Sequence, residues 1–348
     1  MRTAAQIADL LGQHAPTDEQ AAIIEAPLEP LLVVAGAGSG KTETMAARVV
    51  YLIANGLVEP DRILGLTFTR KAAGELSDRV RARLRSLRGR LDPAVRTSVF
   101  SAPTISTYNS YAAGLVGDHA LRLGLEPSAR LLGEAGRWQL AHDVVEHWAA
   151  DLEVDSAAST VVDAVLSLAG QLAEHLVEPA ELRAEAERLV DALTRAPLVD
   201  RVLAADARLL RDVASSAALR ARLVDLVEAF TARKRERDVL DFGDQVALAA
   251  RLAREAPEVG AAERARFDVV LLDEYQDTSV AQLVLLRSLY GRDAGPGVGH
   301  PVTAVGDPHQ SIYGWRGASA GGLARFVEDF PRVVRDPVAT GGSAHDGG

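Results

Sequence analysis

The sequence predicts an α/β protein in which a parallel sheet is covered by helices and interrupted by an all-helical inserted domain. Three observations lead to this prediction. Short apolar runs alternate with helical patterns towards both ends of the chain, a glycine-rich turn joins the first run to a helix, and the middle of the chain is almost free of glycine. Alternating strands and helices are typical of doubly wound α/β domains, because the crossover helices cover both faces of the sheet.

Five short runs have the composition of buried strands. Each is apolar, is bounded by turn residues and is too short for a core helix. The runs form two groups, one before about residue 111 and one after about residue 237. They cover residues 31–34, 63–68, 104–107, 269–272 and 302–305.

The middle of the chain differs from both ends. Residues 137–241 contain a single glycine, and apolar residues recur there at helical spacing, as in Leu182, Ala186 and Leu189. We therefore expect a helical domain inserted into one α/β domain. The final residues are rich in glycine and poor in apolar side chains, so we expect disorder there. The expected boundaries are 1–111 and 237–335 for the two parts of the α/β domain, 112–236 for the helical domain and 336–348 for the tail.

Composition excludes several classes of protein. The 348 residues are 48% hydrophobic and 25% charged, which is ordinary for a globular protein. The absence of cysteine excludes disulfides, thiolate zinc sites and iron–sulfur clusters within the chain. No apolar run approaches the roughly eighteen residues of a membrane span. The N-terminus lacks a secretion-signal pattern, so we expect a cytoplasmic protein with no membrane partner.

The net charge of −10 argues against a uniformly basic protein that coats nucleic acid. A local basic groove is still sufficient for DNA binding. One candidate is an arginine-dense stretch, which is either a solvated helical face or a row of phosphate contacts, and the sequence leaves both open. Its arginines are Arg79, Arg81, Arg83, Arg85, Arg88 and Arg90.

The glycine-rich turn is a candidate phosphate-binding loop. Residues 35–42 read AGAGSGKT, between the first apolar run and a helical pattern. The backbone N–H groups of such a turn point inward, and the N-terminus of the following helix adds partial positive charge. Lys41 would reach the β- and γ-phosphates, and Thr42 would ligate Mg²⁺. The pattern GxxxxGK[ST] is met except at its first position, where Ala35 replaces glycine.

A later apolar run ends in two acids, Asp273 and Glu274. This strand would deliver Asp273 to the carboxyl edge of the sheet beside the loop, where it could hold Mg²⁺. Glu274 could polarise an attacking water as a general base. A strand that ends in two acids is common by itself. Together with the phosphate loop, it favours an ATPase over a solvated strand end.

Residues 305–310 also follow a predicted strand, and Gln310 would lie close enough to sense the γ-phosphate. Beyond it, Tyr313, Trp315 and Arg316 combine two aromatic rings with a cation, which suits base stacking and phosphate contact. Core packing of the two rings is the alternative, because tryptophan is usually largely buried.

These motifs together resemble the UvrD/Rep-like superfamily-one DNA helicases over nearly the whole α/β part of the chain. Residues 16–20 resemble the family's adenine-reading element, with Gln20 as the base reader. The family's own phosphate loop has alanine at the first position, as Ala35 does here. Residues 273–278 and 306–318 match long and specific signatures of the family.

Two further segments resemble the family's DNA-contacting elements. They are residues 67–73 and 107–110. Arg70 stands where the family usually has Asn, and Asn109 stands where it often has His. The resemblance therefore implies a track for single-stranded DNA along this face. The candidate DNA-binding residues are Phe68, Thr69, Arg70, Tyr108, Tyr313, Trp315 and Arg316.

The resemblance implies a RecA-like P-loop NTPase domain that binds ATP and Mg²⁺. With a second RecA-like domain it would translocate 3′ to 5′ on single-stranded DNA and act at single-strand/duplex junctions, in DNA repair or recombination. It also implies a nucleoid-associated location and catalytic roles for Lys41, Glu274 and Gln310. The expected nucleotide contacts are Gln20, Ala35, Gly36, Ala37, Gly38, Ser39, Gly40, Lys41 and Thr42, and the expected metal ligands are Thr42 and Asp273.

The Arg-containing elements of the family's second domain find no match in this sequence. We therefore expect the N-terminal ATP-binding part of a larger motor, either truncated or completed by another chain. Within the family, residues 43–50 and Arg70 resemble the AdnB-type subunit of actinobacterial helicase–nucleases. The alternative is a non-motor subunit that binds ATP and DNA inside a helicase–nuclease complex. A phosphate-loop kinase or GTPase is disfavoured, because the sequence has no guanine-reading Asn-Lys-x-Asp element.

Overall fold

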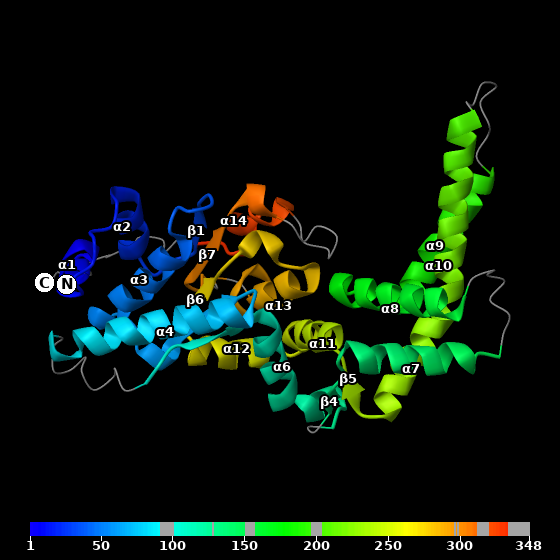
Figure 1. Cartoon of the computed structure of the whole chain (residues 1–348), viewed down its shortest axis with the longest axis horizontal. Coiled ribbons are helices and arrows are strands. Elements are labelled where there is room, and N and C mark those ends of the chain that lie inside the picture. Colours follow the sequence, from blue (N-terminus) through cyan, green and yellow to red (C-terminus); the bar gives the residue numbers. More distant parts are fainter. Residues whose placement is uncertain are drawn as a thin grey trace, which may run out of the picture.

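The structure is a computed structural model of the chain. Figure 1 shows an α/β body, which carries the N-terminus, and a helical part that extends from it. The predicted α/β class with a parallel sheet is confirmed. The structure describes residues 1–90, 101–126, 129–149, 157–195, 204–295, 297, 299–311 and 320–332.

Five parallel strands form the central sheet in the order β1-β7-β6-β2-β3. β7 pairs with β1 on one side and with β6 on the other, and β6 also pairs with β2. The two ends of the sequence therefore build one sheet, and the carboxyl ends of β1, β6 and β7 open at the same edge. The bounds are β1 Leu31–Val34, β2 Ile63–Thr67, β3 Thr104–Thr107, β6 Val269–Leu272 and β7 Val302–Gly306.

Side chains alternate between the two faces of the sheet, as the period of a strand requires. Along β6, Val269 and Leu271 pack in a core with α1 to α4. Val270 and Leu272 pack in a second core with α6, α11, α12 and α13. Helices therefore cover both faces, with bounds α1 Ala4–Leu10, α2 Asp18–Glu25, α3 Lys41–Ala54, α4 Arg70–Leu87, α6 Tyr108–Asp118, α11 Phe242–Glu255, α12 Pro257–Arg266, α13 Val280–Tyr290 and α14 Phe326–Asp329.

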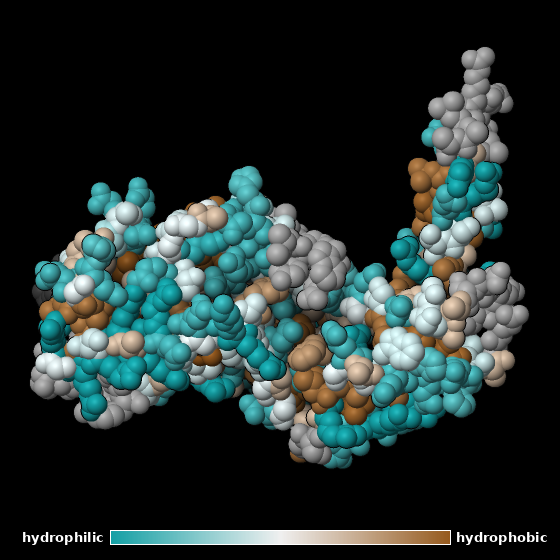
Figure 2. Space-filling model, in the orientation of Figure 1, coloured by the Kyte–Doolittle hydropathy of each residue, from teal (hydrophilic) through white to brown (hydrophobic). Residues whose placement is uncertain are grey.

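A second group of helices has its own hydrophobic core, which includes Val165, Leu226 and Phe230. In Figure 1, α9 and α10 form a hairpin that projects from the molecule, and Figure 2 shows apolar side chains on its surface. Leu189 of α9 and Leu209 of α10 are 40% and 62% exposed there. The bounds are α7 Glu134–Glu146, α8 Ala158–His175, α9 Pro179–Arg195 and α10 Ala204–Glu236.

Within the described residues, no single helix has the length and apolar composition needed to cross a membrane. In the same described part of the chain, α8 and α9 taken together pass on length and composition, and they are bent by 105° relative to each other.

The chain enters and leaves the helical part through a two-stranded parallel sheet that the sequence did not predict. Its strands are β4 (Arg130–Leu131) and β5 (Val239–Leu240). The expected boundary at residue 112 falls inside α6, where Ala112 and Leu115 are buried in the α/β core. The packing therefore assigns α6 to the α/β body, and the helical part begins closer to β4.

A buried charge cluster lies at the junction between the two parts. Lys234, near the end of α10, is 4% exposed. Its ammonium lies 3.1 Å from Asp241 Oδ2 and 2.7 Å from Asp244 Oδ1. Arg137 of α7 lies 3.1 Å from the same oxygen of Asp241. Burial opposes ionisation of Asp241, but Lys234 and Arg137 outweigh burial and lower the pKa of this carboxyl group.

Replacing Lys234 by methionine should lower the free energy of unfolding by about 3–5 kcal/mol, because buried carboxylates lose their cation. Urea unfolding followed by circular dichroism measures this change. Arg233→Met is the matched control, since Arg233 pairs with Glu236 at 3.4 Å while its side chain is 44% exposed. The control should change stability by no more than about 1 kcal/mol. Equal losses in the two variants would show that the buried cluster does not hold the junction.

Candidate functional site

The turn after β1 has the backbone shape of an anion cradle. Gly38 and Gly40 have φ angles of 74° and 82°, in the left-handed region that favours glycine. Gly40 precedes α3, and no side chain caps this helix, so its first N–H groups are directed to the turn without a side-chain partner. Ser39 Oγ donates to Gly36 O at 2.8 Å and closes the turn.

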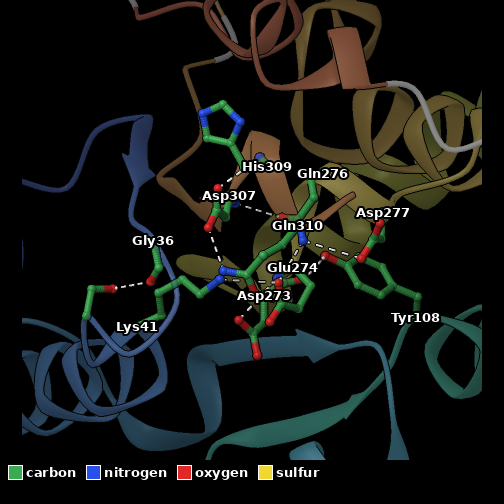
Figure 3. Close-up of polar contacts among 11 residues, drawn as sticks. Gly36, Lys41, Tyr108, Asp273, Glu274, Gln276, Asp277, Asp307, His309 and Gln310 are labelled. Atoms are coloured by element: carbon green, nitrogen blue, oxygen red, sulfur yellow. Dashed lines mark hydrogen bonds and ion pairs between the residues drawn. The ribbon is translucent and has the colours of Figure 1, made fainter. Parts of the chain in front are cut away.

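Lys41 begins α3 and extends towards the end of β6 (Figure 3). Its Nζ lies 3.6 Å from Glu274 Oε2, and its side chain is 10% exposed. Among the described residues, no acceptor is within hydrogen-bond distance of this buried ammonium. Donors left unused in a buried group cost free energy, which a phosphate oxygen would recover. The geometry therefore suits the phosphate contact that the sequence predicts, and Thr42 follows in the same helical turn.

Two acids follow β6 at this edge of the sheet. Asp273 is 4% exposed, and its N–H donates to Leu66 O of β2 at 2.9 Å. Burial, together with the neighbouring charge of Glu274, raises the pKa of Asp273 to about 6. Glu274 has φ 49° and ψ 42°, a left-handed conformation that costs free energy in a residue with a side chain. This turn directs the Glu274 carboxylate towards Lys41, as Figure 3 shows.

Gln276 joins Glu274 to the turn after β7 (Figure 3). Its side chain is buried, donates from Nε2 to Glu274 Oε2 at 2.8 Å, and accepts from the Asp307 N–H at 3.0 Å. Gln310 in turn donates to the Asp307 carboxylate. The backbone N–H of His309 and then Gln310 lower the pKa of this carboxyl group. Gln276 was not predicted from the sequence as a site residue, and its place two residues after Glu274 is the signal that could have found it.

Gln20 reaches the phosphate loop from α2. Its Nε2 donates to Ser39 O at 3.1 Å, and its Oε1 accepts from the Thr17 N–H at 3.1 Å. A cavity of about 510 Å³ lies beside it, between α1, α2, α3 and α4, and Thr44 contributes to its wall. A cavity of this size can hold a small molecule. Gln20 therefore stands between the loop and a space large enough for a nucleoside.

The candidate DNA track is exposed only in part. Thr69 and Arg70 are exposed at the N-terminus of α4. Tyr108 differs from the expectation, because it is 4% exposed and its hydroxyl donates to Asp273 O at 3.0 Å. Phe68 contacts its ring edge-on, with 6.0 Å between ring centroids. Tyr108 therefore supports the backbone of Asp273 and has no exposed face for a base. Tyr313, Trp315 and Arg316 lie outside the described residues.

The arginine-dense stretch contains both arginines that pair with a carboxylate on α3 and arginines exposed to solvent. Arg83 is buried and pairs with Glu43, and Arg79 pairs with the same carboxylate at 3.1 Å. These two side chains hold α4 against α3. Arg81 and Arg85 are exposed on the opposite side of α4.

The sequence motifs at this edge have a counterpart among known proteins. Residues 16–331 match the family described as the UvrD/REP helicase N-terminal domain. The chain belongs to the UvrD/REP helicase family. Its five-stranded parallel sheet with a phosphate loop after β1 is consistent with the RecA-like fold of this domain.

Individual relatives of this UvrD-family chain are named as DNA helicases. "ATP-dependent DNA helicase UvrD1" of Mycobacterium tuberculosis is 32% identical over 320 residues, which are 91% of this chain and 35% of the relative. "Probable DNA helicase II homolog" of Rickettsia felis is 29% identical, over 86% of this chain and 38% of the relative. "ATP-dependent DNA helicase PcrA" of Leuconostoc citreum is 27% identical, over 91% and 35%. The chain therefore spans just over a third of the length of these relatives.

Alanine at position 306 of this UvrD-family chain should displace Gln276. A Cβ atom on Gly306 would lie 2.7 Å from Gln276 Oε1 and 3.0 Å from Leu323 Cδ2. Gly306→Ala should therefore lower the free energy of unfolding by about 1–3 kcal/mol, measured by urea unfolding.

The matched control is Gly74→Ala in α4, where an added Cβ would meet no atom within 4 Å. This control should raise the free energy of unfolding by up to about 1 kcal/mol, because alanine favours the helix. A Gly306→Ala chain as stable as the wild type would contradict the close approach of Gln276.

Proposed function

We propose that the chain is the ATP-binding and hydrolysing part of a DNA helicase. The observation that carries this proposal is the meeting of three groups at one sheet edge. They are a glycine-rich anion cradle, the Asp273–Glu274 carboxylates, and the buried ammonium of Lys41, which has no hydrogen-bond acceptor among the described residues and lies 3.6 Å from one Glu274 oxygen. Family membership and the names of the relatives support the same function.

In the proposed mechanism, the N–H groups of the loop and Lys41 bind the β- and γ-phosphates. Thr42 and Asp273 would hold Mg²⁺, because hydroxyl and carboxylate oxygens are the donors that this ion prefers. The ion would neutralise charge on the phosphate oxygens. Glu274 orients and polarises the attacking water as a general base. Gln310, bonded to Asp307, stands in the next turn of the same edge and would sense the γ-phosphate.

We further propose that this ATPase drives 3′ to 5′ movement on single-stranded DNA at single-strand/duplex junctions, in repair or recombination. The exposed start of α4 supports a DNA track, because Thr69 and Arg70 lie on the surface close to the edge that holds Asp273. A second RecA-like domain would complete the motor and supply the arginine that stabilises the transferred phosphate, worth about 10³–10⁵ in rate. An AdnB-type helicase–nuclease subunit is the finer assignment, and a non-motor subunit that only binds ATP and DNA is the alternative.

The phosphate-loop assignment is tested with two substitutions that separate binding from hydrolysis. Lys41→Ala should weaken ATP binding in calorimetry by about tenfold or more, because a charge-assisted contact to phosphate is lost. Glu274→Gln should bind ATP as the wild type does but lose any turnover, with and without single-stranded DNA. Unchanged ATP affinity in Lys41→Ala would overturn the proposed function. Binding without turnover in the wild type would mean that the second domain supplies an essential part of the catalytic site.

The DNA track is tested through the salt dependence of binding. Arg70→Ala should weaken the binding of fluorescent single-stranded DNA and reduce the slope of log K against log salt by about one, because one phosphate contact is lost. Arg81→Ala is the matched control, since Arg81 is an exposed arginine further along α4. The same slope in Arg70→Ala as in the wild type would remove Arg70 from the track.

A further inference from the structure

Arg48 is a buried cation that no carboxylate neutralises among the described residues. It lies in α3, seven residues after Lys41, and is 1% exposed. Its guanidinium donates five hydrogen bonds, all to uncharged oxygen atoms. Burial lowers the pKa of Arg48 to about 10, which reflects the cost of keeping this charge away from water. A group held at such cost requires an explanation beyond packing.

Two of the five bonds go to the last turn of α2, and two go to the carbonyl oxygens of the two residues that follow Glu25, the last residue of the helix. The last carbonyl oxygens of a helix have no partner within the helix and carry partial negative charge, so a cation is favoured there. The planar guanidinium can serve several of these oxygens at once. Arg48 donates to Ile23 O at 2.9 Å, Ile24 O at 3.2 Å, Ala26 O at 2.9 Å and Pro27 O at 3.1 Å.

The fifth bond goes to the sheet. Arg48 Nε donates to Thr303 Oγ1 at 3.2 Å, and Thr303 lies in β7, the strand that leads to Asp307. The side chain of Arg48 therefore connects three elements: its own helix α3, the end of α2, and the central strand β7. Because α3 and β7 belong to the core of the body, the effect of Arg48 is to fix α2 on that core.

The other end of α2 touches the phosphate loop through Gln20. Gln20 Nε2 donates to Ser39 O at 3.1 Å, and a Cβ on Gly40 would lie 3.1 Å from the same nitrogen. The helix is only eight residues long, so a shift at its C-terminal end moves Gln20 as well. The position of Gln20 beside the 510 Å³ cavity thus depends on the hydrogen bonds of Arg48 to the end of α2 and to Thr303.

We propose that Arg48 is a positioning residue for base recognition: it holds α2 so that Gln20 can bind the base of the nucleotide. This inference rests on the proposed function, because it requires that the chain binds ATP. It concerns the base, since the phosphate contacts of the proposed function are made by the loop and Lys41. A purely structural role would affect base and phosphate binding alike, and the two roles are therefore separable.

The test compares the affinity for Mg²⁺·ATP with that for Mg²⁺·tripolyphosphate, the same anion without a nucleoside, by calorimetry on the full chain. The ratio of the two affinities measures the contribution of the nucleoside. Arg48→Lys retains the charge but has three donors from one atom in place of the guanidinium fork. It should weaken ATP binding about tenfold and tripolyphosphate binding less than twofold, the size expected for the loss of a hydrogen bond to the base.

Two further variants make the test specific. Gln20→Ala should lower the same ratio, and adding Arg48→Lys to it should lower the ratio no further, because both act through one contact. Thr303→Val removes a single hydrogen bond of Arg48 and should give a smaller loss in a chain that folds normally. Met45→Leu, a volume-conserving change in the same helix, is the control and should leave the ratio unchanged.

The outcomes separate this inference from the function on which it rests. A wild type that binds neither ligand would overturn the proposed function and the inference with it. A wild type that binds both, with Arg48→Lys lowering both affinities equally or neither, would overturn the inference alone. Additive losses in the Gln20→Ala/Arg48→Lys double variant would also overturn it.

Discussion

The hydrogen bonding of β7 between β1 and β6 is the constraint on which the functional edge depends. The phosphate loop and the paired acids are more than two hundred residues apart in sequence, and β7 is the strand that joins them. Because all pairings are parallel, the carboxyl ends open at one edge, where Gly306 is the partner of Val34. A slip of one residue would reverse the faces of β7 and move Gly306 away from Gln276.

Neutral groups hold the two acids in place at this edge. Gln276 donates to the carboxylate of Glu274, and Tyr108 donates to the backbone carbonyl of Asp273. Such bonds fix position without supplying a countercharge. Lys41, the nearby cation, lies 3.6 Å from Glu274, outside hydrogen-bond distance. In the proposed function, Lys41 would exchange this loose ion pair for a phosphate contact.

The features that could be predicted from the sequence are those controlled by hydrophobic periodicity and by turn residues. All five strands of the main sheet were predicted, because short apolar runs next to glycine-rich turns have few other structures. The hydrogen-bond partners of polar side chains could not be predicted in this way. Nothing in the sequence says that Gln276 bonds to Asp307, or that the hydroxyl of Tyr108 turns inward, because these contacts join segments brought together only by the sheet. The β4–β5 pair was missed since each strand has only two residues.

Arg48 was not predicted either, because its partners are also distant in sequence. Its position shows how the fold stabilises α2. An eight-residue helix such as α2 is marginal alone, because nucleation is costly and its ends leave backbone groups unpaired. The capping box at Thr17 pairs backbone N–H groups at the N-terminal end of α2, and Arg48 donates hydrogen bonds to carbonyl oxygens at the C-terminal end. A lone buried cation and the left-handed Glu274 both carry a cost. Glu274 lies at the carboxyl edge of the sheet, whereas Arg48 bonds to Thr303, which is opposite Leu31 at the start of β1. The buried Lys234 at the junction is instead neutralised by carboxylates. The carbonyl oxygens at the end of α2 therefore compensate the buried charge of Arg48, whereas the backbone conformation of Glu274 is a cost carried at the edge itself.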